Sequence, residues 1–179
     1  MTKKLTRLIG DIHGLVNEYT AYAIDKFDGP TIQIGDFGIG FGQGEYWLEY
    51  VSEFHKRGGH RFIRGNHDPK VAKFEALFES VKNQATFRRE NGGERVVLCH
   101  YPLRAWRGQL SGAMHLYGHT HGALQEVGRS MDVGVDSWNY SPVRLSHALD
   151  VLAARPVMRP GGWVRRQDMR HDVAADLPT

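Results

Sequence analysis

The chain has 179 residues, of which 41% are hydrophobic and 24% are charged. This composition is typical of a globular protein and excludes a disordered or fibrous chain, and the length allows one domain with a proper core. The formal charge of +3 and the pI near 9.1 suit an anionic partner, but they suit a basic surface that serves only solubility equally well.

The single cysteine, Cys99, excludes an internal disulfide framework, and its apolar neighbours predict a small buried hydrophobic side chain. The first residues include two lysines but no apolar stretch long enough for a signal peptide. No run approaches the roughly 20 apolar residues that a membrane span needs. We therefore expect a cytoplasmic protein with no membrane partner.

Short apolar runs alternate with amphipathic stretches along the first half of the chain, which is the pattern of an α/β protein. Apolar runs predict strands, and apolar residues at helical spacing predict helices. Strands are predicted over residues 5–9, 31–34 and 61–63, and helices over residues 15–27, 45–56 and 71–81.

The second half is richer in short strands. Strand-like runs at residues 85–89 and 95–99 flank Asn91-Gly92-Gly93, a strong hairpin signal. Further strands are predicted over residues 113–117, 123–127 and 130–133. A last helix is predicted over residues 142–153, with Ser141 as its cap.

The chain divides into a predicted domain over residues 1–154 and a basic tail over residues 155–179. The tail contains three prolines, a Gly-Gly pair and several arginines. It is either loosely packed or a nucleic-acid contact that neutralises backbone phosphates.

Five short motifs contain nearly all the unusual polar residues, and each follows directly on a strand-like run. Sites in open α/β sheets are assembled at the carboxyl ends of strands, so these loops are expected to converge on one edge. Glycine before the polar residue allows the backbone to turn sharply. The motifs are Gly10-Asp11-Ile12-His13-Gly14, Gly35-Asp36-Phe37-Gly38, Gly65-Asn66-His67-Asp68, His100-Tyr101-Pro102 and Gly118-His119-Thr120-His121.

The residue types in these motifs are those of a metal site. Asp11 and His13, like His119 and His121, are two residues apart, so in an extended segment their side chains point the same way. Imidazole and carboxylate ligands together suit Zn, Mn, Fe, Co or Ni, and not a site built only for calcium. The remaining histidines are expected to be structural or surface residues: His55, His60, His115, His147 and His171.

In this order, the five motifs resemble the calcineurin-like metallophosphoesterase superfamily over residues 8–136, most of the chain. The resemblance implies a four-layer α/β/β/α sandwich with two mixed β-sheets. It also implies two divalent metal ions, with Mn²⁺ as the usual activator and Ni²⁺, Zn²⁺, Fe²⁺ or Co²⁺ as alternatives.

The resemblance also assigns roles to individual residues. One metal would take Asp11, His13 and His121, and the other would take Asn66, His100 and His119. Asp36 would bridge the two metals together with a water or hydroxide. His67 corresponds to the family's histidine beside the leaving group, and Asp68 corresponds to the acid that orients it.

The implied activity is hydrolysis of a phosphoester by in-line attack of the metal-bridging hydroxide, with His67 protonating the leaving group. The arginine of the GDxxDRG motif of protein phosphatases is absent, because the second motif continues Gly38-Ile39-Gly40. The pattern is closer to small bacterial and phage phosphodiesterases and broad phosphoesterases. We therefore expect a small, nucleotide-like phosphoester substrate.

Two alternatives remain open. The basic tail favours a nuclease or a nucleic-acid end-processing enzyme, although the capping domain common in nuclease members has no room in this chain. A non-catalytic binding module on the same fold is opposed by the complete set of ligand residue types.

Three residues near the motifs are candidates for substrate binding. Arg104 and Arg107 follow the His100 motif and either hold a phosphate oxygen or are ordinary surface arginines. Phe41 lies in the loop over residues 38–44, which either overhangs the site or leads into the next helix.

Overall fold

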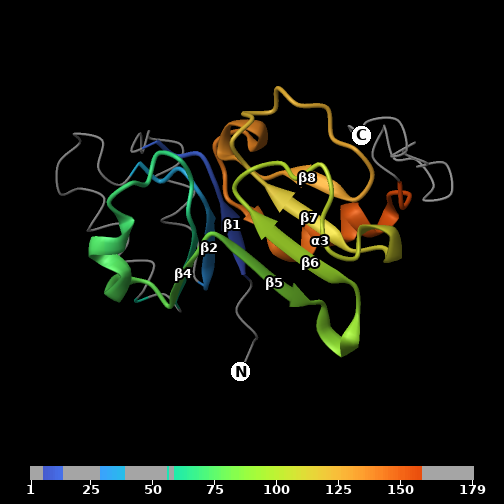
Figure 1. Cartoon of the computed structure of the whole chain (residues 1–179), viewed down its shortest axis with the longest axis horizontal. Helices are drawn as coiled ribbons and strands as arrows, with labels where there is room; N and C mark the ends of the chain where they lie inside the picture. Colours follow the sequence, from blue (N-terminus) through green and yellow to red (C-terminus); the bar gives the residue numbers. More distant parts are fainter. Residues whose placement is uncertain (1–5, 14–28, 39–55, 57–58, 159–179) are drawn as a thin grey trace, which may run out of the picture.

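The computed structural model describes residues 6–13, 29–38, 56 and 59–158. These residues form an α/β fold with two mixed β-sheets, sheet A and sheet B (Figure 1). The helix predicted over residues 15–27 lies outside the described residues. So do the helix predicted over residues 45–56, except Lys56, and the loop over residues 38–44 with Phe41, except Gly38.

Sheet A has five strands in the order β4-β3-β2-β1-β9. The first four are mutually parallel, and β9 runs antiparallel to β1. Because the parallel strands all run the same way, their carboxyl ends lie at one edge of the sheet. The strands are β1 (Arg7–Ile9), β2 (Thr31–Ile34), β3 (His60–Ile63), β4 (Ser80–Lys82) and β9 (Val143–Arg144).

Sheet B has four strands in the order β5-β6-β7-β8. The predicted hairpin is confirmed: β5 pairs antiparallel with β6, and the 3-10 helix η2 (Glu90–Gly92) connects them. β6, β7 and β8 are parallel. The strands are β5 (Gln84–Arg88), β6 (Arg95–Cys99), β7 (Met114–Tyr117) and β8 (Ser130–Asp132).

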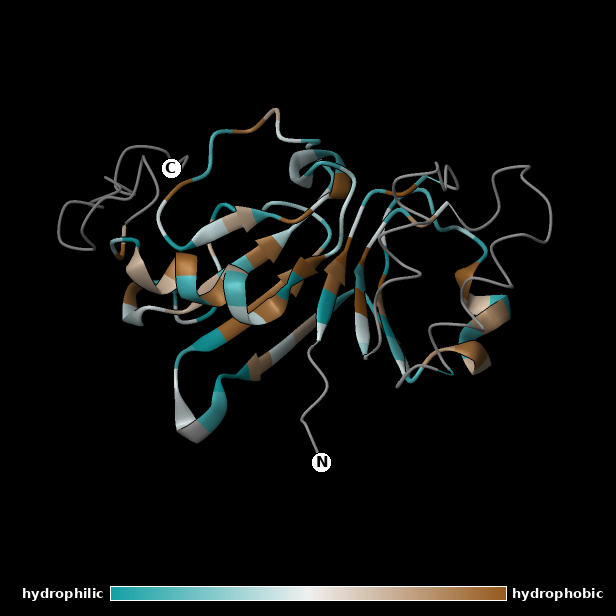
Figure 2. Cartoon of the chain, turned by 180° about the vertical axis from the view of Figure 1, so that it is seen from behind, coloured by the Kyte–Doolittle hydropathy of each residue, from teal (hydrophilic) through white to brown (hydrophobic). Residues whose placement is uncertain are grey.

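The two sheets share a hydrophobic core. Alternate residues of each strand face it, among them Leu8 and Ile34 from sheet A and Leu98 and Leu116 from sheet B. The helix α3 (Leu145–Ala154) adds Leu149 and other apolar residues to the same cluster. In Figure 2 strong hydrophobic colouring lies on the strands in the middle of the molecule.

The opposite face of sheet A carries a second, smaller cluster. Ile9 and Phe62 are neighbours in the chain of the core residues Leu8 and Ile63, so their side chains point the other way. Phe62 packs against Phe78, with ring centroids 4.9 Å apart. This cluster also holds Ile12 and Phe37, which lie in the loops after β1 and β2, and it thereby supports the edge where the motifs lie.

The opposite face of sheet B is covered by the loop between β6 and β7. His115 of β7 points outward and accepts the Leu103 N–H at 3.0 Å through Nε2, while its Nδ1–H donates to the Val97 carbonyl at 3.1 Å. Trp106 packs over the His115 ring at a centroid distance of 5.3 Å. A histidine predicted to be structural therefore attaches this loop to the sheet.

The structure corrects three predicted elements. The helix predicted over residues 71–81 is a 3-10 helix, η1 (Val71–Leu77), followed by β4, because pairing of Val81 with Phe62 overrides the helical spacing. The strand predicted over residues 123–127 is absent from both sheets. The last helix starts at Leu145 and not at Pro142, since Val143 and Arg144 pair with β1 first.

Two further findings concern the ends of these elements. Arg144, and not Ser141, is the N-cap residue of α3, and the Ser141 hydroxyl donates to the Asn139 carbonyl instead. Arg155, the first residue of the predicted tail, donates to the Ser130 carbonyl at 2.7 Å and pairs with Glu126 at 2.7 Å.

Among the described residues, no helix has the length and apolar character that crossing a membrane requires.

Candidate metal centre

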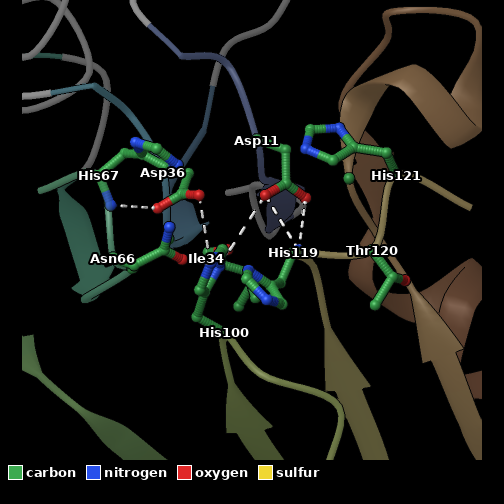
Figure 3. Close-up of polar contacts among 12 residues, drawn as sticks. Asp11, Ile34, Asp36, Asn66, His67, His100, His119, Thr120 and His121 are labelled. Carbon is green, nitrogen blue, oxygen red and sulfur yellow. Dashed lines mark hydrogen bonds and ion pairs between the residues drawn. The ribbon is translucent and has the colours of Figure 1, made fainter. Parts of the chain in front are cut away.

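The five motifs meet at the carboxyl ends of the parallel strands. Asp11 follows β1, Asp36 follows β2, Asn66 follows β3, His100 follows β6 and His119 follows β7. Figure 3 shows these side chains directed toward one another from the two sheets. The predicted convergence on one edge follows from the parallel order of the strands and from the contact between the sheets.

Ligand atoms from these motifs form three compact groups, in each of which they lie within 4.8 Å of one another. One oxygen, Asp36 Oδ2, lies 3.3 Å from His100 Nε2 and 3.8 Å from His13 Nε2. A single carboxylate therefore faces histidines of two different groups. The groups are Asp11, His13 and His121; His13, Asp36 and His67; and Asp36, His100 and His119.

The backbone at five of these residues is in the left-handed region. The φ angles are 55° at Asp11, 54° at His13, 49° at Asp36, 71° at His119 and 49° at His121. Non-glycine residues rarely adopt such angles, and strained positions of this kind cluster at functional sites. The chain thus departs from its preferred conformation where it presents these side chains.

Two glycines allow the backbone to approach the side chains closely. Gly35 has a φ of 73°, and a Cβ there would overlap the ring of His100. A Cβ on Gly118 would lie 2.5 Å from Asp11 Oδ2. These glycines are predicted to form sharp turns, and the structure shows that they also make room for neighbouring carboxylate and imidazole groups.

His100 is fully buried, and its hydrogen bonds define which nitrogen faces the centre. Its Nδ1–H donates to the Ile34 carbonyl at 3.1 Å, so Nε2 points toward Asn66 Oδ1 at 3.0 Å and Asp36 Oδ2 at 3.3 Å (Figure 3). When His100 is neutral, its Nε2 is an acceptor like Asn66 Oδ1 and Asp36 Oδ2. The three atoms therefore need a proton on Nε2 or a cation between them. Burial lowers the pKa of His100, but the hydrogen bond and charge of Asp36 outweigh it and raise the pKa.

His121 is oriented by a residue that the sequence reasoning missed. Its Nδ1–H donates to Asp136, which directs Nε2 toward His13 Nε2 at 3.3 Å. A carboxylate behind a histidine in this way is common at metal sites, where it selects the tautomer and raises the basicity of the ligand. Asp136 follows β8 within Asp132-Val133-Gly134-Val135-Asp136, and its place shortly after the predicted strand over residues 130–133 is the signal that could have identified it.

Asp11 is held by the motif that follows β7. Both of its oxygens accept the His119 backbone N–H at 3.0 Å, and its side chain is fully buried. Burial raises the pKa of Asp11 to about 7, although the His119 N–H and nearby His100 act in the opposite direction. A buried carboxylate that is this reluctant to ionise gains stability from an adjacent cation, so the donor set fits a divalent metal.

Asp68 connects two of the motif loops through their backbones. Its Oδ2 accepts the N–H groups of Asp36 at 2.8 Å and Gly65 at 3.0 Å, and its Oδ1 accepts that of Gly38 at 3.0 Å. The neighbouring His67 donates its backbone N–H to Asp36 Oδ1 at 2.8 Å. Burial raises the pKa of Asp36, but the bonds from His100 and the His67 N–H outweigh it and lower that pKa.

Asp132 is a second residue that the sequence reasoning missed. It is 3% exposed and accepts the Thr120 hydroxyl at 2.7 Å, the Gly122 N–H at 3.1 Å and the Gly134 N–H at 2.8 Å. It therefore connects the loop of His119 and His121 to the segment that carries Asp136. Its position at the end of β8 is the same signal that marks the predicted motifs.

Two of the three predicted substrate-binding residues are described by the structure, and both are exposed. Arg104 is exposed and lines a cavity on the outer face of sheet B, and none of the candidate ligands lines that cavity. Arg107 is also exposed. Phe41 lies outside the described residues.

Comparison with known proteins identifies a shared fold. No protein-family model and no curated protein matches this sequence. The solved structure of AQ665 from Aquifex aeolicus, a protein of unknown function, matches with a TM-score of 0.61 and 16% identity, over 83% of this chain and 98% of that one. Nuclease MPE from Pseudomonas putida matches with a TM-score of 0.44 and 22% identity, over 65% of this chain and 61% of that one.

The two structural matches do not support equally strong conclusions. The first shows that this chain and the Aquifex aeolicus protein have the same fold. The second is too low to support an argument about structure or activity. The functional conclusion therefore depends on the candidate metal centre itself.

Proposed function

We propose that this chain is a metal-dependent phosphoester hydrolase of the calcineurin-like metallophosphoesterase superfamily, with that superfamily's four-layer sandwich. The observation that carries the proposal is the position of Asp36 Oδ2, between His100 Nε2 at 3.3 Å and His13 Nε2 at 3.8 Å. A carboxylate oxygen that faces one histidine on each side is suited to bridge two metal ions.

The ligand assignment is the one that the family resemblance implies, and two of the three groups of ligand atoms support it. Asp11, His13 and His121 would hold one ion, and Asn66, His100 and His119 would hold the other, with Asp36 shared. The donor set contains two carboxylates, four imidazoles and one amide oxygen, which suits Mn²⁺, Ni²⁺, Zn²⁺, Fe²⁺ or Co²⁺. Since Asn66 adds no charge, two divalent ions would leave net positive charge for a phosphate anion.

When bound, the two ions would supply Lewis-acid charge to phosphate oxygens and lower the pKa of a water molecule. The residues of the chain hold and orient the reacting groups around them. His67 contacts the His13 ring edge-on at 5.0 Å and shares a ligand group with His13 and Asp36, which supports a position near the leaving group of a bound ester. We assign it the transfer of a proton to the leaving oxygen.

We propose a small nucleotide-like phosphoester as the substrate. Nothing in the described residues favours a long nucleic acid over such a substrate, because Arg155 of the predicted tail is engaged with Ser130 and Glu126. A non-catalytic role of the fold is an outcome that the following experiment can reveal.

The test is hydrolysis of bis-p-nitrophenyl phosphate and p-nitrophenyl phosphate by metal-stripped protein refilled with Mn²⁺, Ni²⁺ or Zn²⁺. We expect turnover only with metal, and loss of both turnover and one bound ion in Asp36→Asn. The matched control is Asp150→Asn, which changes an exposed aspartate of α3. The ratio of the two rates distinguishes a diesterase from a monoesterase. A protein that binds no metal would refute the proposal and support a non-catalytic role, and one that binds two ions without turnover of either ester would point to a narrower natural substrate.

A further inference from the structure

The two histidines of the fifth motif belong to different ligand groups. His119 lies with Asp36 and His100, whereas His121 lies with Asp11 and His13. Their spacing would direct both rings the same way only in an extended segment. The φ angles of 71° at His119 and 49° at His121 are left-handed, so the segment is not extended and the two rings diverge. One short turn therefore contributes a histidine to each of the two metal positions.

Thr120 lies between these histidines and attaches the turn to sheet B. Its hydroxyl donates to Oδ2 of Asp132, the last residue of β8, at 2.7 Å. The Gly122 N–H donates to the same oxygen at 3.1 Å. In Figure 3 the Thr120 side chain points away from the rings of His119 and His121. One carboxylate oxygen thus holds the turn on both sides of His121.

Asp132 is itself held from several directions. Its Oδ1 accepts the Gly134 N–H at 2.8 Å, and its carbonyl accepts the Trp138 indole N–H at 2.9 Å. Its backbone N–H donates to Glu126 Oε1 at 2.8 Å, while Glu126 Oε2 pairs with Arg155 at 2.7 Å. Because these contacts come from separate segments, the carboxylate that Thr120 contacts has a defined position.

The turn needs such an anchor because its backbone is strained. A left-handed φ is unfavourable for a residue other than glycine, and it persists where surrounding contacts enforce it. The Thr120 N–H donates to the Gly118 carbonyl at 2.9 Å, and the Thr120 carbonyl accepts the Ala123 N–H at 2.7 Å. These bonds lie within the turn, whereas the bond from Thr120 to Asp132 connects the turn to the sheet. Loss of that bond should allow both histidines to move.

We propose that Asp132, acting through the Thr120 hydroxyl, is the positioning residue for both His119 and His121, so that one hydrogen bond sets the affinity of both metal positions. The consequence for metal affinity rests on the proposed function, but the positions of the two rings do not. Asp136 differs in this respect, because it hydrogen-bonds to His121 and therefore acts on one metal position.

The first test uses the metal-stripped full chain and the NMR signals of the histidine rings. Thr120→Val removes the donor but keeps the shape and charge of the side chain. We expect the ring signals of His119 and His121 to shift and that of His115, on the outer face of sheet B, to stay unchanged. Thr120→Ser keeps the hydroxyl and should restore the original signals. Thr86→Val, which changes an exposed threonine of β5, is the matched control.

The second test is titration of the same proteins with Zn²⁺ in competition with a chelating dye. We expect Thr120→Val to weaken both binding steps about 10-fold, whereas Thr120→Ser and Thr86→Val keep the affinity of the unmodified chain. Asp136→Ala should weaken only the step that uses His121. In an Asp132→Ala background, Thr120→Val should have little further effect, because the two residues act as one unit.

Two results would overturn the proposal. One is a folded Thr120→Val variant in which the ring signals of both histidines are unchanged. The other is weakening of only one binding step, since the hydroxyl would then act on one histidine. If the unmodified chain binds no metal, the hydrolase proposal fails, and the metal-free ring signals alone decide whether Thr120 positions the two rings. Thr120→Ala removes the same donor if Thr120→Val impairs folding.

Discussion

Asp68 Oδ2 accepts the backbone N–H of Asp36 at 2.8 Å, so the carboxylate that ends the third motif holds the loop that carries the shared oxygen of the second. The same carboxylate accepts two further N–H groups, from Gly65 and Gly38. Because Asp68 is 3% exposed, these bonds have no competition from water. This role is separate from the orientation of His67 that the family resemblance implies.

Asp68→Asn replaces an acceptor oxygen with an N–H donor that faces other donors. We expect the free energy of unfolding of the metal-free protein to fall by about 1–3 kcal/mol, measured by urea denaturation. Asp150→Asn, which breaks an exposed ion pair with Arg89, should cost less than about 1 kcal/mol. Equal stability of Asp68→Asn and the unmodified chain would show that the loops do not depend on this carboxylate.

Asp136 should tune metal affinity through His121. Asp136→Ala removes the acceptor of the His121 Nδ1–H, which frees the ring to rotate and lowers its basicity. We expect metal affinity to fall about 10- to 100-fold in competition with a chelating dye. Asp136→Asn keeps an acceptor oxygen but carries no charge, so its metal affinity should lie between those of Asp136→Ala and the unmodified chain. An unchanged affinity in Asp136→Ala would exclude His121 as a ligand oriented in this way.

His67 should matter most for esters with poor leaving groups. His67→Gln removes the proposed proton donor, so hydrolysis of an alkyl phosphoester should slow by about 10²- to 10⁴-fold. A p-nitrophenolate leaving group needs no proton and should be affected far less. His147→Gln, which changes an exposed histidine of α3, is the control. If both substrates slowed equally, His67 would act in binding and not as an acid.

His115 should make stability depend on pH. Burial lowers the pKa of His115 to about 4, below the usual value of about 6.5 for an unfolded chain. The unfolded chain therefore binds this proton more tightly, and stability that is fully present above pH 6.5 is lost as the pH falls toward 4, by about 3 kcal/mol in total. Urea unfolding of the metal-free protein at pH 8, 7, 6 and 5 measures this loss.

The comparison variant for this prediction is His115→Gln. Glutamine can still donate to the Val97 carbonyl and accept the Leu103 N–H, but it does not titrate. We expect the variant to lose clearly less stability between pH 7 and 5 than the unmodified chain. Parallel pH profiles for the two proteins would assign the loss to other groups.

Local sequence predicted the strands well where burial is nearly continuous. The runs that became β2, β6 and β7 are buried at almost every residue, and their apolar composition shows this directly. Prediction failed where pairing partners decided the outcome. Val81 has helical spacing from the residues of η1, yet it pairs with Phe62 and extends sheet A.

The candidate centre, like the strands, could be predicted only where a local sequence pattern marks it. A polar residue after an apolar strand is visible in sequence, and Asp11, Asp36 and His100 were identified from it. Asp132 and Asp136 carry the same signal, but their importance depends on contacts with Thr120 and His121 more than ten residues away. The sequence does not reveal those contacts.

The sequence by itself determined which segments are buried strands and which polar side chains stand at their ends, because apolar runs and glycine turns are local properties. Only the tertiary structure decided that Asp36 Oδ2 lies close to both His100 and His13, and that Gln109 Oε1 is buried with no hydrogen-bond partner among the described residues. These relationships depend on how segments that are distant in the chain pack together, and the local composition of each segment does not determine the distances between them.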